Sequence, residues 1–198
     1  MSTLPVPGST PQTARAAETA ARRRRLLEAA IELANEGGYD AVQMRDVAAR
    51  AQVALGTLYR HYSSKDELLL AALADQARTL RTRLAQRPPR GELAGDRVAD
   101  VLRRATRALT RDPAVTAAMV TALSSSGSEA AASKRAVNDI LRTIISSAVD
   151  GATVPDLDGI VRVLGYVWIA TLDAWVGAMI DATGMADDLA TAAHLLLD

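Results

Sequence analysis

Side chains that could carry catalysis are few and scattered in this sequence of 198 residues. It contains no cysteine, and its two histidines, His61 and His194, lie far apart along the chain. These facts exclude a cysteine nucleophile, a thiolate metal site and a metal site built from several histidines. His61 could serve as a general base, but no nucleophile and partner carboxylate cluster with it. We therefore expect a protein that is not an enzyme and holds no metal or cofactor.

Residues suited to binding rather than catalysis are concentrated at positions 43–62. Two short stretches there carry apolar residues at helical spacing and meet at a break near Gln52 and Val53. Ala48 and Ala51 stand where the two helices would cross, and side chains this small let the backbones approach closely. The pattern predicts a helix-turn-helix, whose second helix enters the major groove of DNA.

The second of these helices is too short to bury much of its own surface. Only Leu58 and Tyr62 are expected to face a core. Its remaining faces carry short or uncharged side chains where a structural helix would usually carry Glu or Lys, and such side chains suit a groove lined by phosphates. They are Leu55, Gly56, Thr57, Tyr59 and His61.

The stretch Ala-Leu-Gly-Thr-Leu-Tyr-Arg-His-Tyr at residues 54–62, followed by Ser-Ser-Lys-Asp-Glu-Leu-Leu, resembles the TetR family of one-component repressors. Residues 26–39 resemble the first helix of that family, and the likeness in order and spacing covers residues 20–80. Residues 37–45 and the pair Trp168 and Trp175 are similar to the branch of actinobacterial sterol-catabolism repressors, the KstR type. Two residues depart from the family: many relatives have Ser or Thr as the N-cap at the position of Gln43, and Ser is frequent at the position of Ala54.

The resemblance implies that Arg45 contacts a base edge or a phosphate, and arginine is the usual partner of guanine. It also implies that Thr57 and Tyr59 contact phosphates and that Lys65 contacts the DNA backbone. Alternatives stay open, since Arg45 could pair with Asp46 or Glu36, Tyr59 could belong to the core, and Lys65 could be a plain surface residue.

The arginine run at residues 22–25 adds candidates, because four consecutive charges cannot share one helix face. At Gly56 the missing side chain fits close approach of the backbone to DNA, and a helix kink is the alternative. The predicted DNA-binding residues are Arg22, Arg23, Arg45, Ala54, Leu55, Gly56, Thr57, Tyr59, His61 and Lys65.

The rest of the chain predicts an all-α fold of about nine helices. Alanine and arginine, both strong helix formers, occur 40 and 21 times, and strand-like runs are scarce. We expect a disordered leader at residues 1–19, a three-helix DNA-binding domain at 20–65 and an effector-binding and dimerisation domain at 66–198. No signal peptide or membrane-spanning run is expected, so the protein should be cytoplasmic.

The helices expected in residues 66–198 offer mainly apolar walls with few polar groups, which suits a small lipid-like effector. The resemblance implies a sterol metabolite, in free form or as its coenzyme A (CoA) thioester. Arg103, Arg104 and Arg107 are expected to form a solvated face, although they could meet an acidic ligand. The predicted ligand-binding residues are Leu102, Thr106, Leu109, Met119, Leu123, Ile140, Ile144, Trp168, Leu172 and Trp175, with core packing as the alternative for the two tryptophans.

The helix predicted at residues 156–182 is apolar nearly all round, whereas a surface helix of a monomer shows only an apolar stripe. With the last helix it should form the seam of a homodimer. The sequence thus predicts a repressor that binds double-stranded palindromic operator DNA as a dimer and is released by a small apolar effector. The alternatives are a TetR-like activator and a DNA-binding protein that responds to no ligand.

Overall fold

The computed structural model describes residues 11–125, 130–149 and 154–198. Within these ranges the fold is all-α, with nine helices, as the sequence predicts. They are α1 (Pro11–Ala41), α2 (Met44–Arg50), α3 (Leu55–His61), α4 (Lys65–Gln86), α5 (Ala94–Leu109), α6 (Pro113–Ser124), α7 (Ala131–Ala148), α8 (Leu157–Val176) and α9 (Ala182–Leu197).

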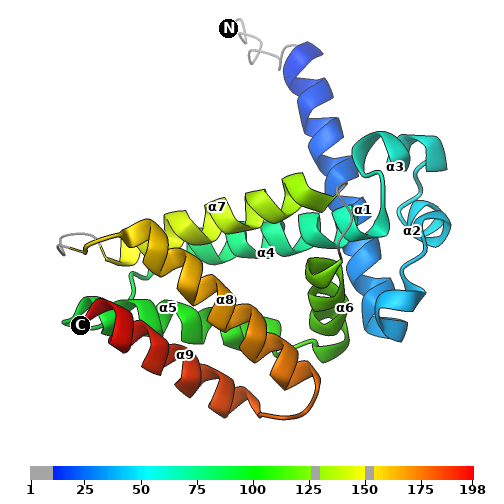
Figure 1. Ribbon diagram of the computed structural model, residues 1–198. Coiled ribbons are helices and arrows are strands. Elements are labelled where there is room, and N and C mark those ends of the chain that lie inside the picture. The colour runs from blue at the N-terminus through cyan, green and yellow to red at the C-terminus, as the bar shows by residue number, and fades with distance from the viewer. Residues whose placement is uncertain (1–10, 126–129, 150–153) are drawn as a thin grey trace, which may run out of the picture.

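The helices form two connected groups (Figure 1). α1, α2 and α3 lie together at one end, and α4 runs from them into a bundle in which it packs beside α7 while α5 packs beside α9. α6 packs against α1 and α4, so it joins the bundle to the first group. One continuous hydrophobic core extends from Leu26 and Leu58 in the first group to Leu68, Met119 and Leu189 in the bundle.

The leader predicted at residues 1–19 is wrong from Pro11 onward, and residues 1–10 lie outside the described part of the chain. Helix α1 begins at Pro11, where proline costs little because the first turn needs no N–H donor. The alanine-rich stretch that follows favours a helix, and Arg22 pairs with Glu18 one turn earlier at 2.7 Å. Residues 13–20 are exposed, so this part of α1 projects from the body of the protein (Figure 1).

Gly37 and Gly38 interrupt α1. Gly38 has φ 67° and ψ −156°, a backbone conformation that only glycine adopts readily. The resulting kink turns the chain toward α2.

The helix predicted at residues 156–182 is wrong at its end, because α8 stops at Val176. Ala178 has a positive φ of 55°, and the Asp181 carboxylate then accepts a hydrogen bond from the Gly184 N–H at 2.7 Å. That cap starts α9 at Ala182, slightly before the predicted start.

Helix α8 leaves a large apolar surface uncovered. In the described part of the chain it is the single helix long and apolar enough to cross a membrane, and 28% of that stretch is buried inside the protein. Its side chains Val163, Tyr166, Ile169 and Val176 recur at helical spacing on the exposed side. A long apolar helix that is exposed to this degree requires another apolar partner.

Candidate functional site

Helices α2 and α3 form the predicted helix-turn-helix. Val47, Ala48 and Ala51 on the first helix and Leu58 on the second are buried. The turn between them is sharp, since Gln52 has a positive φ of 54° and the Val53 N–H donates to the Ala48 carbonyl at 2.9 Å. The two helices are therefore held at a fixed angle by packing and by the turn.

The outer face of α3 presents the residues that the sequence singled out. Ala54, Leu55, Gly56 and Tyr59 are exposed, and Thr57 and His61 are half-buried. Tyr59 is 51% exposed, so the alternative that it belongs to the core is wrong. We call these six residues together with Arg45 the recognition surface.

Arg45 lies at the start of α2 with its side chain exposed. It has no ion pair within residues 11–125, 130–149 and 154–198. Glu36, one of its two predicted partners, is taken by Arg50, whose guanidinium binds both carboxylate oxygens at 2.6 and 3.0 Å. This hydrogen bonding lowers the pKa of Glu36 and raises that of Arg50. Arg50, which sequence reasoning missed, therefore ties α2 to α1 and leaves Arg45 available.

The arginine run ties α1 to the recognition helices. The Arg23 Nε donates to the Tyr62 hydroxyl at 3.1 Å, and the Arg25 Nε donates to the Ala51 carbonyl at 3.3 Å. Burial raises the pKa of the Tyr62 hydroxyl, and the nearby Arg23 opposes that shift. Arg23 thus has a structural contact besides its predicted contact with phosphate, and the contact of Arg25 with Ala51 was not predicted.

Lys65 is not a plain surface residue. Its Nζ lies 3.8 Å from the centre of the Tyr39 ring and donates to the Tyr39 carbonyl at 3.4 Å. The Tyr39 hydroxyl in turn donates to Asp66 at 2.5 Å. Burial and this hydrogen bond raise the pKa of Tyr39 to about 12. These contacts fix the kinked end of α1 against the start of α4.

The start of α4 is capped by the side chains of Ser64 and Glu67. The Ser64 hydroxyl accepts a hydrogen bond from the Glu67 N–H at 3.2 Å, and the Glu67 carboxylate accepts one from the Ser63 N–H at 2.7 Å. The connecting helix is therefore held firmly at the end that meets the recognition helices.

The predicted ligand-binding residues lie in the interior of the bundle. Leu123, Trp168 and Trp175 are half-buried, and the other seven are buried. Two polar atoms among them, the Thr106 Oγ1 on α5 and the Trp168 Nε1 on α8, are buried and have no hydrogen-bond partner among the described residues. Such groups cost stability unless something else satisfies them.

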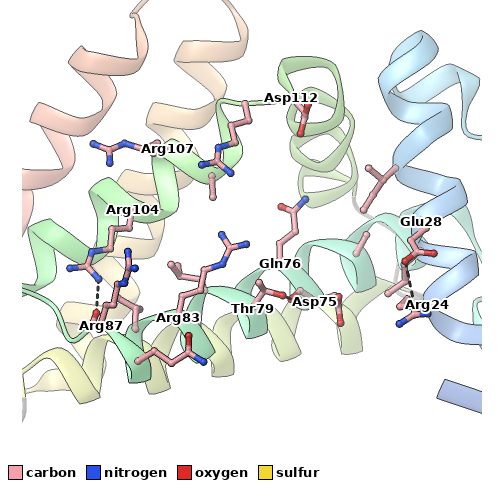
Figure 2. Close-up of a pocket in the computed structure, with 18 of the residues that line it drawn as sticks. Arg24, Glu28, Asp75, Gln76, Thr79, Arg83, Arg87, Arg104, Arg107 and Asp112 are labelled. Atoms are coloured by element: carbon pink, nitrogen blue, oxygen red, sulfur yellow. Dashed lines mark hydrogen bonds and ion pairs between the residues drawn. The ribbon is translucent and has the colours of Figure 1, made fainter. Parts of the chain in front are cut away.

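A separate open cleft of about 1140 Å³ lies between α1, α4 and α5, and none of the predicted ligand-binding residues lines it. Figure 2 shows Arg83 and Gln76 extending from α4 into this space, with Arg104 and Arg107 on α5. We call it the arginine cleft, because seven arginines line it: Arg24, Arg83, Arg87, Arg90, Arg104, Arg107 and Arg111.

Comparison with known proteins identifies both halves of the chain. The family of bacterial regulatory proteins, tetR family, matches residues 26–72, and the tetracyclin repressor-like C-terminal domain matches residues 91–196. The HTH-type transcriptional repressor KstR of Rhodococcus jostii is 40% identical over 89% of this chain and 82% of its own length.

Solved structures agree with this match. A TetR transcriptional regulator from Rhodococcus sp. RHA1 superposes with a TM-score of 0.83 at 35% identity, covering 91% of this chain and 97% of the other. FadR of Thermus thermophilus, solved in complex with lauroyl-CoA, shares the fold with a TM-score of 0.66 at 22% identity, covering 88% of this chain and 92% of that one.

Proposed function

This chain belongs to the TetR family of transcriptional regulators, and from that premise we propose that it is a KstR-like repressor that leaves a palindromic operator when an apolar effector binds. The observation that carries the proposal is the recognition surface. Its exposed residues are carried by α2 and α3, which are held in place by the hydrogen bonds of Arg23 with Tyr62 and of Arg50 with Glu36. Because Arg50 occupies Glu36, Arg45 stays available to contact a base. Such a protein must share a compartment with the chromosome, so we place it in the cytoplasm.

The operator contacts require a second copy of the chain. A dimer presents two recognition helices about 34–36 Å apart, one turn of DNA, and its two-fold axis matches a palindrome. The exposed apolar face of α8 is the part that this second copy would cover, together with α9. Leu189 and Ala193 of α9, which the sequence suggested for the seam, are fully buried inside the protomer, so α8 would supply most of the contact. We expect an interface of at least about 1,200 Å².

The effector would occupy the interior of the bundle, where apolar side chains surround the unpartnered Thr106 and Trp168 atoms. A similarly folded regulator binds lauroyl-CoA, and the resemblance to sterol-catabolism repressors implies a sterol skeleton. Both considerations favour an apolar molecule carried as a CoA thioester. Binding would shift α4, change the spacing of the recognition helices and lower operator affinity.

The test is a titration of the protein's own upstream intergenic DNA, followed by fluorescence anisotropy, with a panel of sterol and fatty acyl-CoA thioesters. The expected result is tight binding to a palindromic site and release by one class of thioester. An activator or a ligand-independent binder would keep its operator in the presence of every compound.

Two filling substitutions test where the effector binds. Met119 and Ile144 are buried in the bundle, so Met119→Trp and Ile144→Trp should block release while operator binding stays intact. Asn138→Trp, at an exposed position of α7, is the matched control and should respond like the wild type. If both filled variants still release DNA at the ordinary effector concentration, the effector binds elsewhere.

A further inference from the structure

The first part of α1 extends from the protein without packing against it. Residues 13–20 are all exposed, and the contribution of this helix to the hydrophobic core begins at Leu26. Figure 1 shows this part extending past α3 and away from α5, α8 and α9. We call residues 13–22 the arm. Because the arm adds nothing to the core, it is suited to a contact outside the protomer.

The sequence of the arm itself favours a helix. Five of its ten residues are alanine, the strongest helix former. The Arg22 guanidinium donates to the Glu18 carboxylate at 2.7 Å, and the Thr19 hydroxyl donates to the Arg15 carbonyl at 2.9 Å. The arm also continues a helix that is already packed from Leu26 onward, so it needs no separate nucleation. The arm therefore keeps a defined direction relative to the rest of α1.

The arm begins where the recognition surface ends. The Arg23 Nε donates to the hydroxyl of Tyr62, the residue that caps the C-terminal end of α3. Because a helix rises 1.5 Å per residue, Arg15 lies about 12 Å further along α1 than Arg23. The arm thus leads away from the recognition helix and would meet whatever lies beside the surface that α3 contacts.

The charge of this part of α1 is mainly positive, although the chain as a whole has a formal net charge of zero. Residues 11–25 contain five arginines and one acidic residue, Glu18. Arg15 is exposed and makes no ion pair in the described part of the chain. It lies seven residues before Arg22, so the two arginines share one side of the helix. A basic segment that extends from a DNA-binding domain is suited to the phosphates of DNA.

We propose that the arm lies along the DNA backbone outside the segment that α3 reads, where Arg15 and Arg22 bind phosphates of the flanking duplex. The inference rests on the proposed function, because it takes the recognition surface to face DNA. Alanine side chains are small enough to let the helix approach the backbone closely, and arginine binds phosphate through charge-assisted hydrogen bonds. Phosphates are the same in every duplex, so the arm adds affinity rather than sequence preference.

Glu18 limits the strength of this contact. It lies three residues after Arg15 and four before Arg22, on the same side of the helix, and it pairs with Arg22 at 2.7 Å. Its negative charge repels the phosphates that the two arginines attract. A contact that ignores sequence strengthens binding to every duplex, so an acidic residue here reduces the share of non-specific binding.

The first test measures binding of the full chain to a duplex of mixed sequence at several salt concentrations. Arg15→Gln should lower the affinity about tenfold and reduce the slope of log affinity against log salt by about 1.8, because a dimer loses two phosphate contacts. Arg81→Gln is the matched control, since it removes an exposed arginine of α4 that has no ion pair among the described residues. It should bind within about twofold of the wild type with an unchanged slope.

A second variant should change the affinity in the opposite direction. Glu18→Gln removes the repulsion and frees Arg22, so binding to the same duplex should tighten about threefold or more. Asp139→Asn removes one negative charge from an exposed position of α7 and should leave the affinity unchanged. Damage to the fold could weaken binding in both arm variants, but it could not strengthen binding in one of them.

Hydroxyl-radical cleavage of the protein's own upstream DNA would locate the contact. The wild type should protect the backbone on both flanks of the palindrome, and Arg15→Gln should lose this protection while the palindrome itself stays protected. Flanks that are cleaved equally in the wild type and in Arg15→Gln would overturn the proposal. An equal loss of affinity in Arg81→Gln would do the same, and so would a monomeric Arg15→Gln in light scattering, since the arm would then belong to a dimer contact.

The arm and the proposed function can fail separately. If Arg15→Gln loses affinity and flank protection as expected but no effector releases the wild type, the proposed function fails while the arm contact stands. If an effector releases the wild type from a palindromic operator but Arg15→Gln binds every duplex as the wild type does, only the arm contact is wrong.

Discussion

The recognition surface and the arginine cleft are both cationic, yet they are built in opposite ways. The recognition surface has one exposed arginine, Arg45, among small and uncharged side chains, and the surrounding arginines are engaged in holding its frame. The arginine cleft has seven arginines, of which five have no carboxylate partner among the described residues. The arginine cleft therefore gathers seven arginines at a place that includes no residue of the recognition surface.

This difference reflects what each surface has to distinguish. Reading a base sequence requires a few side chains at fixed positions, because the phosphates on either side are the same in every duplex. A concave site lined by many guanidinium groups is instead suited to a small anion, which such groups bind with charge-assisted hydrogen bonds.

The largest expected effect comes from separating the two copies of the chain. Ile169 is 42% exposed on the apolar side of α8, and Ile169→Glu places a charge where the second copy would pack. Operator affinity should fall by about 100- to 10,000-fold, because a monomer loses the second recognition surface.

Light scattering and anisotropy on the same sample would check this result. Asn138→Glu adds the same charge at an exposed position of α7 and should remain a dimer with full operator affinity. A monomeric wild type that still binds a palindromic site tightly would contradict the dimer.

The next effect concerns base reading by Arg45. Arg45→Ala should cost roughly 1–3 kcal/mol of operator binding and relax the preference at one base pair in each half-site. The side chain is exposed and makes no ion pair in the described part of the chain, so stability should change little. Binding to a library of operator variants would measure both quantities. Equal loss on every duplex would instead assign Arg45 to a phosphate.

Gly56 tests how closely the backbone of the recognition helix approaches DNA. A Cβ at this position would meet no atom within 4 Å, so Gly56→Ala should stabilise the free protein by about 0.5–1 kcal/mol. If the backbone lies against DNA, the same methyl group should lower operator affinity roughly tenfold for all sequences alike. Thermal unfolding and operator titration would measure the two effects.

Gly38 provides the contrast, because its positive φ makes glycine necessary to the fold. Gly38→Ala should destabilise the protein by about 1–3 kcal/mol. Stabilisation by Gly56→Ala without any loss of DNA binding would show that Gly56 has no role at the groove.

The sequence predicted the recognition helices well because their signals are local. Small residues at 48 and 51, the glycine pair at 37–38 and the Ser64 cap each act within a few residues of their position. The end of α8 was missed because apolar residues continue through Met179 and Ile180, although Gly177 at the C-cap and Asp181 at the next N-cap are local signals. The helix ends there because of the positive φ at Ala178 and the Asp181 cap.

Contacts between segments that lie far apart in the chain could not be predicted from the sequence. Arg23 meets Tyr62, 39 residues away, and Arg25 meets Ala51 across 26 residues. The arginine cleft had a partial signal, because Arg104 and Arg107 recur at helical spacing on α5 and Arg111 follows just after its end. These arginines line one cleft with Arg83 only because α1, α4 and α5 pack together. The three helices are far apart in the sequence, so no single segment predicts this packing.

The smallest expected effect concerns the stability provided by Tyr39, which links the end of α1 to the start of α4. Tyr39→Phe removes the hydrogen bond to Asp66, which should cost about 1 kcal/mol of stability at neutral pH. The pKa of Tyr39 is raised from about 10 to about 12, so its neutral form is the one that the fold favours. Its contribution is therefore fully present below pH 10 and is lost as the pH rises toward 12. The stability gap between wild type and Tyr39→Phe, followed by denaturant unfolding from pH 8 to 12, should be constant at first and then shrink.

Tyr59→Phe is the matched variant that separates the frame from the surface it supports. Tyr59 is exposed, so removing its hydroxyl should change stability little while it weakens binding to all duplexes through a lost phosphate contact. Tyr39→Phe should do the reverse, lowering stability with little direct effect on operator affinity. If the two variants gave the same pattern, the division between a structural frame and a DNA-contacting surface would be wrong. If the stability and operator affinity of the two variants differ as expected, Tyr39 supports the recognition surface without contacting DNA, whereas Tyr59 contacts DNA without supporting the fold.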